Sequence, residues 1–197
     1  VIQKYLEISE NEIKKLLIYR ILELCLVLVV DQFGNYVIQN LIQMNFVAVT
    51  NNVIDQMLPN ILFYSKHKYS SNVVEKCFDH ADQAGIQKLL QALNHTPILN
   101  DLILDEHGNY VMQKVLEKCN VEEQNEIFNN ILPIVPKLKS LIFGERILNI
   151  LCNNYPQMSL LVYGKDGKKK KKPGKKGGKG KGKKDKENKE TQQGKYP

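Results

Sequence analysis

The stretch FGNYVIQNLIQ, from Phe33 to Gln43, decides the fold. Read as a helix, it places Asn35 and Gln39 one turn apart on one face, with Tyr36 beside them. The apolar side chains of the stretch then fall on the opposite face: Val37, Ile38 and Leu41. In a single helix this pattern indicates a solvated polar face on one side and core on the other.

The same pattern returns along the chain at a nearly constant interval. Related stretches are KYSSNVVEKCF from Lys68 and EHGNYVMQKVLEKC from Glu106. The intervals between the polar residues that close each unit are 36, 36 and 38 residues, counted over Gln3, Gln39, Glu75 and Gln113. A further 36 residues on, Asn149 in FGERILNIL keeps the apolar pattern. Self-similarity at such a period is typical of stacked repeats.

The residues between these units also predict helices. After each unit the apolar period of about 3.6 continues, then a polar break precedes a second apolar helix. Ser9 and Glu12 have the spacing of a capping box, and Asp31, Ser65 and Asp105 precede helical patterns as expected N-caps. We therefore predict an all-α fold, an α-solenoid of ~36-residue helical repeats over residues 1–155.

Charge divides the chain into two parts. Residues 164–197 hold fifteen Lys and four acidic residues, a balance of +11, whereas residues 1–163 hold thirteen basic and seventeen acidic residues, a balance of −4. We predict a disordered Lys/Gly-rich tail over 156–197, because such a segment cannot bury enough apolar surface to fold. The tail is interpreted as a non-specific RNA contact, a nuclear-localisation signal or a solubilising segment. The residues assigned to RNA contact are Lys168, Lys169, Lys170, Lys171 and Lys172.

Other chemistry finds no support in the sequence. The cysteines, Cys25, Cys77, Cys119 and Cys152, form no CxxC pair, and the histidines do not cluster at ligand spacing, so we expect no metal, no cofactor and a reducing compartment. No catalytic residues are recognisable, and we expect no enzyme. The most apolar run, Leu16 to Val30, contains Arg20 and Glu23, which favours a core helix over a membrane span. The chain starts inside an apolar pattern without Met, so we expect a segment of a longer protein.

A solenoid repeats its surface once per unit, so the polar triplets should form a ladder. Its members are Asn35, Tyr36 and Gln39, then Ser71, Asn72 and Glu75, then Asn109, Tyr110 and Gln113. A merely solvated face has no reason to restore this arrangement in every unit. We therefore predict that the ladder binds a ligand.

The groups of the ladder suit RNA bases. Asn and Gln offer donors and acceptors that match the mixed edge of uracil. The ionised carboxylate of Glu75 only accepts, which matches the adjacent N1–H and N2–H of guanine, and Ser71 leaves room for the purine. Tyr36 and Tyr110 supply rings on which bases stack, worth roughly 1–3 kcal/mol per base. The ladder reads as U, G, U.

These units, with SKHKYSSNVVEKCFDHA around the middle one, resemble the repeats of the Pumilio (PUF) family, whose repeats each read one base. The resemblance covers residues 1 to about 155. It implies a right-handed solenoid in a partial crescent, in which residues 1–155 hold the end of one repeat, three full repeats and a C-terminal cap. It also implies that single-stranded messenger RNA binds antiparallel on the concave face. The implied core is 5′-UGU-3′, with the Asn109, Ser71 and Asn35 units reading the first, second and third base. It further implies binding to 3′ untranslated regions for repression or decay, with translational repressor or deadenylase proteins as partners, in the cytoplasm, as a monomer.

Two units depart from the family pattern. Gln3 closes its unit, but its partner positions precede Val1, so its base is not assigned. The cap has Glu145, Arg146 and Asn149 in the triplet positions, and we interpret it as structural. Two other functions stay open, a helical scaffold for proteins and a nucleolar ribosome-assembly relative suggested by the basic tail.

Overall fold

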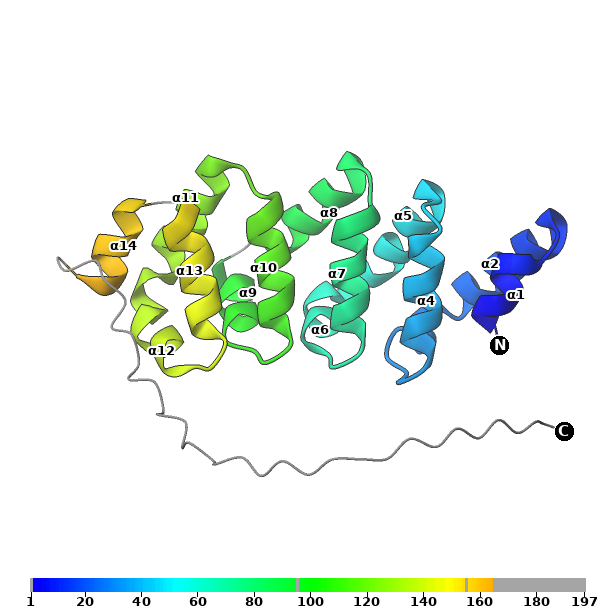
Figure 1. Ribbon diagram of the computed structural model, residues 1–197, viewed down its shortest axis with the longest axis horizontal. Coiled ribbons are helices and arrows are strands. Elements are labelled where there is room, and N and C mark those ends of the chain that lie inside the picture. The colour runs from blue at the N-terminus through cyan, green and yellow to red at the C-terminus, as the bar shows by residue number, and fades with distance from the viewer. Residues whose placement is uncertain (1, 95, 155, 165–197) are drawn as a thin grey trace, which may run out of the picture. The chain divides into compact units, whose positions relative to one another are not determined.

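The computed structural model of the chain describes residues 2–94, 96–154 and 156–164. Every regular element in these ranges is a helix, which confirms the predicted all-helical fold (Figure 1). The predictions for Lys168 to Lys172, and for the rest of the basic tail after Gly164, lie outside the described residues.

Three helices recur in each repeat, a short one followed by two longer ones. The first is the shortest kind and appears as α3 (Cys25–Leu28), α6 (Ile61–Lys66), α9 (Thr96–Ile103) and α12 (Val135–Ser140). The second helices, which carry the predicted triplets, are α4 (Gly34–Gln43), α7 (Ser70–His80), α10 (Gly108–Lys118) and α13 (Gly144–Asn154). The third are α5 (Val47–Met57), α8 (Gln83–Leu93) and α11 (Val121–Ile131). Short 3-10 turns, Leu58–Asn60 (η1) and Leu132–Ile134 (η2), follow α5 and α11.

The remaining helices lie at the two ends of the described chain. Helices α1 (Ile2–Ile8) and α2 (Asn11–Glu23) precede the first complete repeat, and α1 packs against α4. Helix α14 (Pro156–Tyr163) packs against α13. The boundary predicted at residue 155 therefore falls one helix before the end of the helical part.

The second helices lie side by side in chain order, as Figure 1 shows. α4 contacts α7, α7 contacts α10, and α10 contacts α13. Each helix turns a pair of adjacent apolar residues inward, and these pairs are buried apart from the half-buried Val37. The pairs are Val37 and Ile38, Val73 and Val74, Val111 and Met112, and Ile147 and Leu148. Because each layer covers the apolar side of the next, neighbouring repeats share one continuous core.

A tight turn starts each second helix and sets its position. A Cβ atom on Gly34 would lie 2.8 Å from the carbonyl oxygen of Leu28, and one on Gly108 would lie 2.9 Å from that of Leu102. In the middle repeat, Ser70 occupies this place, and its hydroxyl donates to the carbonyl oxygen of Tyr64 at 2.8 Å. The close approach of backbone to backbone thus selects either Gly or a small residue that bonds the carbonyl.

Aspartates organise the same turns in two repeats. The Asp31 carboxylate accepts from the backbone N–H groups of Phe33 and Gly34, and the Asp105 carboxylate accepts from those of His107 and Gly108. These bonds lower the pKa of Asp31. Both residues therefore hold the turn that leads into the helix, but the N-cap positions themselves are Phe33 and His107, so these two predicted N-caps lie two residues too early.

Two other predicted caps are wrong. Ser65 lies inside α6, and the place equivalent to Asp31 is taken by His67, whose Nδ1 accepts from the N–H of Tyr69 at 3.3 Å. Ser9 donates to the carbonyl oxygen of Tyr5 instead of capping α2, because the extended residue before that helix is Glu10. A capping box does form at α11.

Candidate nucleic-acid interface

The first triplet combines a buried amide with an exposed ring. Asn35 is 2% exposed, whereas Tyr36 is 59% exposed. The Asn35 amide nitrogen donates to the carbonyl oxygens of Asp31 at 2.8 Å and Gln32 at 3.0 Å. Its Oδ1 accepts from Nε2 of the half-buried Gln39 at 2.8 Å. Asn35 is therefore not part of a solvated face, because the turn before α4 buries the amide and binds both of its N–H groups.

The third triplet, two repeats further along the chain, has the same arrangement. Asn109 is buried, and its amide nitrogen donates to the carbonyl oxygens of Asp105 and Glu106 at 3.1 and 2.8 Å. Nε2 of Gln113 donates to Oδ1 of Asn109 at 3.3 Å. In both layers the Asn donors are occupied, so the Asn side chain keeps only an acceptor lone pair on Oδ1. Gln39 keeps a free N–H and its Oε1, whereas Nε2 of Gln113 also donates to the backbone carbonyl oxygen of Asn109 at 3.3 Å.

The middle triplet shifts the anchored amide by one position. Ser71 is buried, and Asn72 is exposed. The Asn72 amide nitrogen donates to the carbonyl oxygens of Lys68 and Tyr69, both at 3.2 Å. These two bonds hold the amide plane of Asn72 at the position where Tyr36 and Tyr110 carry rings. Asn72 is thus a rigid flat group on the same row.

Glu75 closes the middle triplet in a charged environment. Its side chain is half-buried, and burial raises the pKa of its carboxyl group, whereas the nearby Lys114 ammonium opposes the rise. Nζ of Lys114 lies 2.8 Å from Asp79 on α7 and 3.3 Å from Glu117 on α10. No hydrogen bond reaches the Glu75 carboxylate from any residue that the structure describes, so both oxygens are open to a ligand.

Exposed groups form a row over the second helices. Tyr36 and Tyr110 are 59% and 41% exposed, and the exposed Asn72 stands at the equivalent position of the helix between them. The row therefore alternates ring, amide and ring over neighbouring helices that are in contact. Such flat groups provide stacking surfaces for unpaired bases.

Gln3 extends the closing positions to α1. It is exposed, and its Nε2 donates to the carbonyl oxygen of Tyr36 at 3.1 Å. Together with Ile2, Phe33 and Val37, these two residues line a shallow cavity of about 470 Å³. The structure thus brings Gln3 next to the first triplet.

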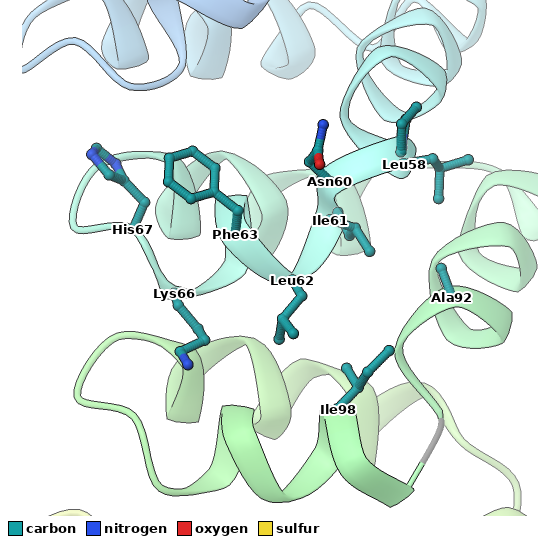
Figure 2. Close-up of a pocket in the computed structure, with 10 residues that line it drawn as sticks. Leu58, Asn60, Ile61, Leu62, Phe63, Lys66, His67, Ala92 and Ile98 are labelled. Atoms are coloured by element: carbon teal, nitrogen blue, oxygen red, sulfur yellow. The ribbon is translucent and has the colours of Figure 1, made fainter.

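A second pocket, of about 690 Å³, belongs to a different set of elements. Figure 2 shows its mainly apolar lining, with Phe63, Leu62 and Ile61 from α6 and Ile98 from α9. Lys66 and His67 also line this pocket, and none of the predicted triplet residues does. This pocket is therefore separate from the ladder.

Sequence reasoning missed two features of this interface. The backbone carbonyls that anchor Asn35, Asn109 and Asn72 cannot be identified from residue types alone. Lys114 directly follows a triplet residue, Gln113, so its place near the interface was readable, but its ion pair with Asp79 crosses between repeats and depends on the stacking.

Alternative chemistry has no corresponding site in the described ranges. No group of three His, Cys, Asp or Glu side chains within residues 2–94, 96–154 and 156–164 is placed to hold a metal ion. No helix among these residues combines the length and the apolar character needed to cross a bilayer. Burial raises the pKa of the Cys25 thiol to about 12 and that of the Cys119 thiol to about 12, so these thiols are protonated at neutral pH.

Comparison with known proteins finds one family throughout. The Pumilio-family RNA binding repeat matches residues 25–45, 60–93 and 99–132, which contain all three triplets. The chain is 36% identical over 140 residues to Pumilio domain-containing protein C6G9.14 of Schizosaccharomyces pombe, with 71% of this chain and 21% of that protein covered. It is 32% identical over 151 residues to Pumilio homolog 12 of Arabidopsis thaliana, with 77% and 25% covered. The chain thus spans about a quarter or less of these relatives.

A solved structure agrees with the sequence comparison. The Puf3 RNA binding domain, bound to the Cox17 RNA 3′ UTR recognition sequence site A, superposes with a TM-score of 0.73 at 27% identity. The superposition covers 84% of this chain and 48% of that domain. The fold of the described helices is therefore that of an RNA-binding repeat domain.

Proposed function

We propose that this chain, which belongs to the Pumilio family of RNA-binding repeat proteins, binds single-stranded RNA containing a 5′-UGU-3′ core. The family is non-catalytic, and its repeats each read one base. The observation that carries the proposal is the acceptor-only Glu75 between two layers that pair an anchored Asn with Gln.

The outer layers suit uracil in their hydrogen-bonding groups. Oδ1 of Asn35 has a free lone pair for the N3–H of the base, and the remaining N–H of Gln39 suits a carbonyl oxygen of the same edge. Asn109 offers the same acceptor, and Gln113 would exchange its long 3.3 Å bond to the backbone carbonyl oxygen of Asn109 for the base. Since the backbone holds the Asn amides before RNA arrives, binding would cost little side-chain entropy there.

The middle layer suits guanine. The two N–H groups on the guanine edge need two acceptors, and the ionised carboxylate of Glu75 supplies them. Ser71 has a small side chain beside it, which leaves space for a purine. A pyrimidine or adenine at this place would leave carboxylate lone pairs unpaired in a half-buried site, which costs free energy.

The order of the bases and the biological setting follow from the family. With RNA antiparallel to the chain, the Asn109 layer takes the first U, the Ser71 layer the G and the Asn35 layer the second U. A neighbour of similar structure, the Puf3 domain, is bound to a 3′ UTR recognition sequence. We assign to this chain the same class of target, messenger RNA 3′ untranslated regions, and a role in cytoplasmic repression or decay.

The replacement Glu75→Gln tests the proposal. Gln presents a donor to one of the two guanine N–H groups, so the preference for UGU over UUU should fall by roughly fivefold to a hundredfold, the range of a good bidentate base contact. Affinities are measured for UGU, UAU and UUU RNAs of equal length. Glu117→Gln is the matched control, since it removes one acidic group beside Lys114 without touching the triplet. An unchanged order of preference in Glu75→Gln contradicts direct reading.

The basic tail is proposed to add affinity without selectivity. Truncation after Tyr163 removes a net charge of +11 carried by residues 164–197. Affinity for all RNAs should then fall alike, and the salt dependence should flatten by about 0.7 in slope for each phosphate that the tail neutralises in the full chain. Filter binding over a series of salt concentrations measures both quantities. A reduction restricted to UGU RNA would contradict this assignment.

A further inference from the structure

We infer that Arg146 of the cap helix α13 forms the outer wall of the slot that holds the first base of the RNA core. This inference rests on the proposed function and adds a binding residue to it. The cap then contributes to RNA binding through one stacking group, although it carries no reading pair of its own.

The backbone places Arg146 in register with the two tyrosines of the ladder. The N–H of Tyr36 donates to the carbonyl oxygen of Phe33 at 3.2 Å, and that of Tyr110 donates to His107 at 3.1 Å. The N–H of Arg146 donates to the carbonyl oxygen of Phe143 in the same way, at 3.1 Å. All three residues lie two positions after the glycine that starts their helix, and α13 packs on α10. Arg146 therefore continues the row of flat groups.

The cap lacks the reading groups of the other layers. Asn35 and Asn109 are buried and anchored, whereas Glu145, at the equivalent place in α13, is exposed. An exposed carboxylate has no fixed orientation toward a base edge. Arg146 thus acts as a wall, and the base beside it is read by the layer before.

The guanidinium group is available for stacking. Arg146 is exposed, and no ion pair or side-chain hydrogen bond joins it to any residue that the structure describes. Arginine is planar and always charged, and it stacks on nucleobases while its edge N–H groups remain free for phosphate. A base between Tyr110 and Arg146 would meet a ring on one side and a guanidinium plane on the other.

One hydrogen bond and one charge interaction indicate which side of a helix each reader faces. Gln3 of α1 reaches forward to the carbonyl oxygen of Tyr36 on α4. The Glu75 carboxyl group of α7 is influenced most, among charged groups, by Lys114 on the following helix α10. Gln3 and Glu75 thus lie toward the next helix. We extend this direction to Gln113, so that the base it reads would lie between α10 and α13, which are in contact.

The spacing of the helices admits one base per interval. Packed helices lie roughly 8–10 Å apart, and a ring in van der Waals contact with both neighbours needs about 7 Å. Four walls, Tyr36, Asn72, Tyr110 and Arg146, enclose three intervals. Three intervals match the three reading layers, whereas a row that ended at Tyr110 would leave the first base stacked on one side only.

The test compares Arg146→Ala with a control of the same charge change, Arg20→Ala. Arg20 lies on α2 and pairs with Glu23, away from the row of walls. Each protein is titrated with UGU RNA and with a matched RNA in which the first nucleotide is abasic, so that its base is missing but its sugar and phosphate remain. Arg146→Ala should weaken binding of intact RNA by about tenfold, as expected for one stacking group, and that of abasic RNA by less than about twofold. Arg20→Ala should change neither.

Two further variants separate stacking from charge and folding. Arg146→Tyr should keep most of the affinity, because a ring replaces the planar group, whereas Arg146→Lys should behave like Arg146→Ala. Equal reductions on intact and abasic RNA, or full affinity in Arg146→Lys, would overturn the inference and assign Arg146 to phosphate. If Arg146→Ala binds RNA as well as the unaltered chain while Glu75→Gln still alters the base preference, the role of Arg146 is wrong and the proposed function stands. Absence of any UGU preference in the unaltered chain would remove the proposed function as well.

Discussion

At the scale of single residues, the backbone determines what a polar side chain presents to RNA. Asn35 and Asn109 use their amide hydrogens on carbonyl oxygens of the preceding turn. In the middle layer the residue at that place is Ser71, and the anchored amide belongs to Asn72 instead. The same local bond pattern thus orients a reader in two layers and a stacking group in the third.

Asn109→Asp tests this anchoring. The carboxylate would face two carbonyl oxygens that it cannot bond, in a buried position, so the free energy of unfolding should fall by about 2–4 kcal/mol. Asn109→Ala should cost less, because it leaves no unpaired charge. Urea unfolding followed by circular dichroism measures both, and an Asp variant as stable as the Ala variant would contradict the bonding described.

The selectivity for guanine should depend on pH. Burial raises the pKa of Glu75, and Asp79 and Glu117 raise it further, while Lys114 and Lys76 lower it. Guanine needs the ionised carboxylate, so the preference for UGU over UUU should be full at neutral pH and decline as pH falls through that pKa. Asn and Gln do not titrate, and protonation of Glu75 removes the unpaired carboxylate that a middle uracil faces, so binding of UUU itself should not weaken over the same pH range.

Lys114 gives this prediction a second variant. Lys114→Met removes the main positive charge near Glu75, so the pKa of Glu75 should rise and the decline of guanine preference should begin at higher pH. Lys118→Met, an exposed lysine on the same helix, is the control. If Lys114→Met leaves the pH profile unchanged, the charge of Lys114 does not influence the titration of Glu75.

At the scale of elements, the entry turn of each second helix sets the register of the ladder. Gly34 and Gly108 approach a backbone carbonyl too closely for a side chain, and Ser70 bonds the equivalent carbonyl of Tyr64. The triplets follow this turn at a fixed offset. A shift of the turn would therefore move all three groups of a layer together.

Gly108→Ala should destabilise the third layer more than Ser70→Ala destabilises the second. The new Cβ lies 2.9 Å from the Leu102 carbonyl oxygen, and relieving that overlap should cost about 1–3 kcal/mol. Ser70→Ala removes one hydrogen bond, worth about 1 kcal/mol. Differential scanning calorimetry ranks the two, with the exposed substitution Gln83→Ala as control. The reverse ranking would show that the turn relaxes easily.

At the scale of the whole molecule, stacking leaves apolar groups exposed on α2. Ile13, Leu16 and Tyr19 are 53%, 59% and 59% exposed, and their spacing of three residues places them on one side of the helix. The corresponding helix of the next repeat, α5, contacts helices on both sides, α2 and α8. Contiguous exposed apolar groups favour association, so a chain that consists of residues 1–197 alone has a specific surface for self-association.

We expect the chain to self-associate through this stripe as its concentration rises. Leu16→Glu combined with Tyr19→Glu should keep it monomeric, because association would then bury unpaired carboxylates. Sedimentation velocity over a concentration series measures the effect. The pair Glu12→Gln and Lys15→Gln, on the same helix and ion-paired with each other, serves as control. Association that persists unchanged in the double Glu variant would place it on another surface.

The sequence by itself determined the repeat period, the helical class, the family and the identity of the triplets, because these are properties of residue type and spacing. Only the tertiary structure decided which atoms the triplets present. Asn35 became a buried acceptor through carbonyls of its own turn, Glu75 acquired Lys114 as a neighbour from the next repeat, and Arg146 entered the row of walls through the stacking of α13. Such features depend on backbone direction and on contacts between repeats, which residue spacing within one repeat does not encode.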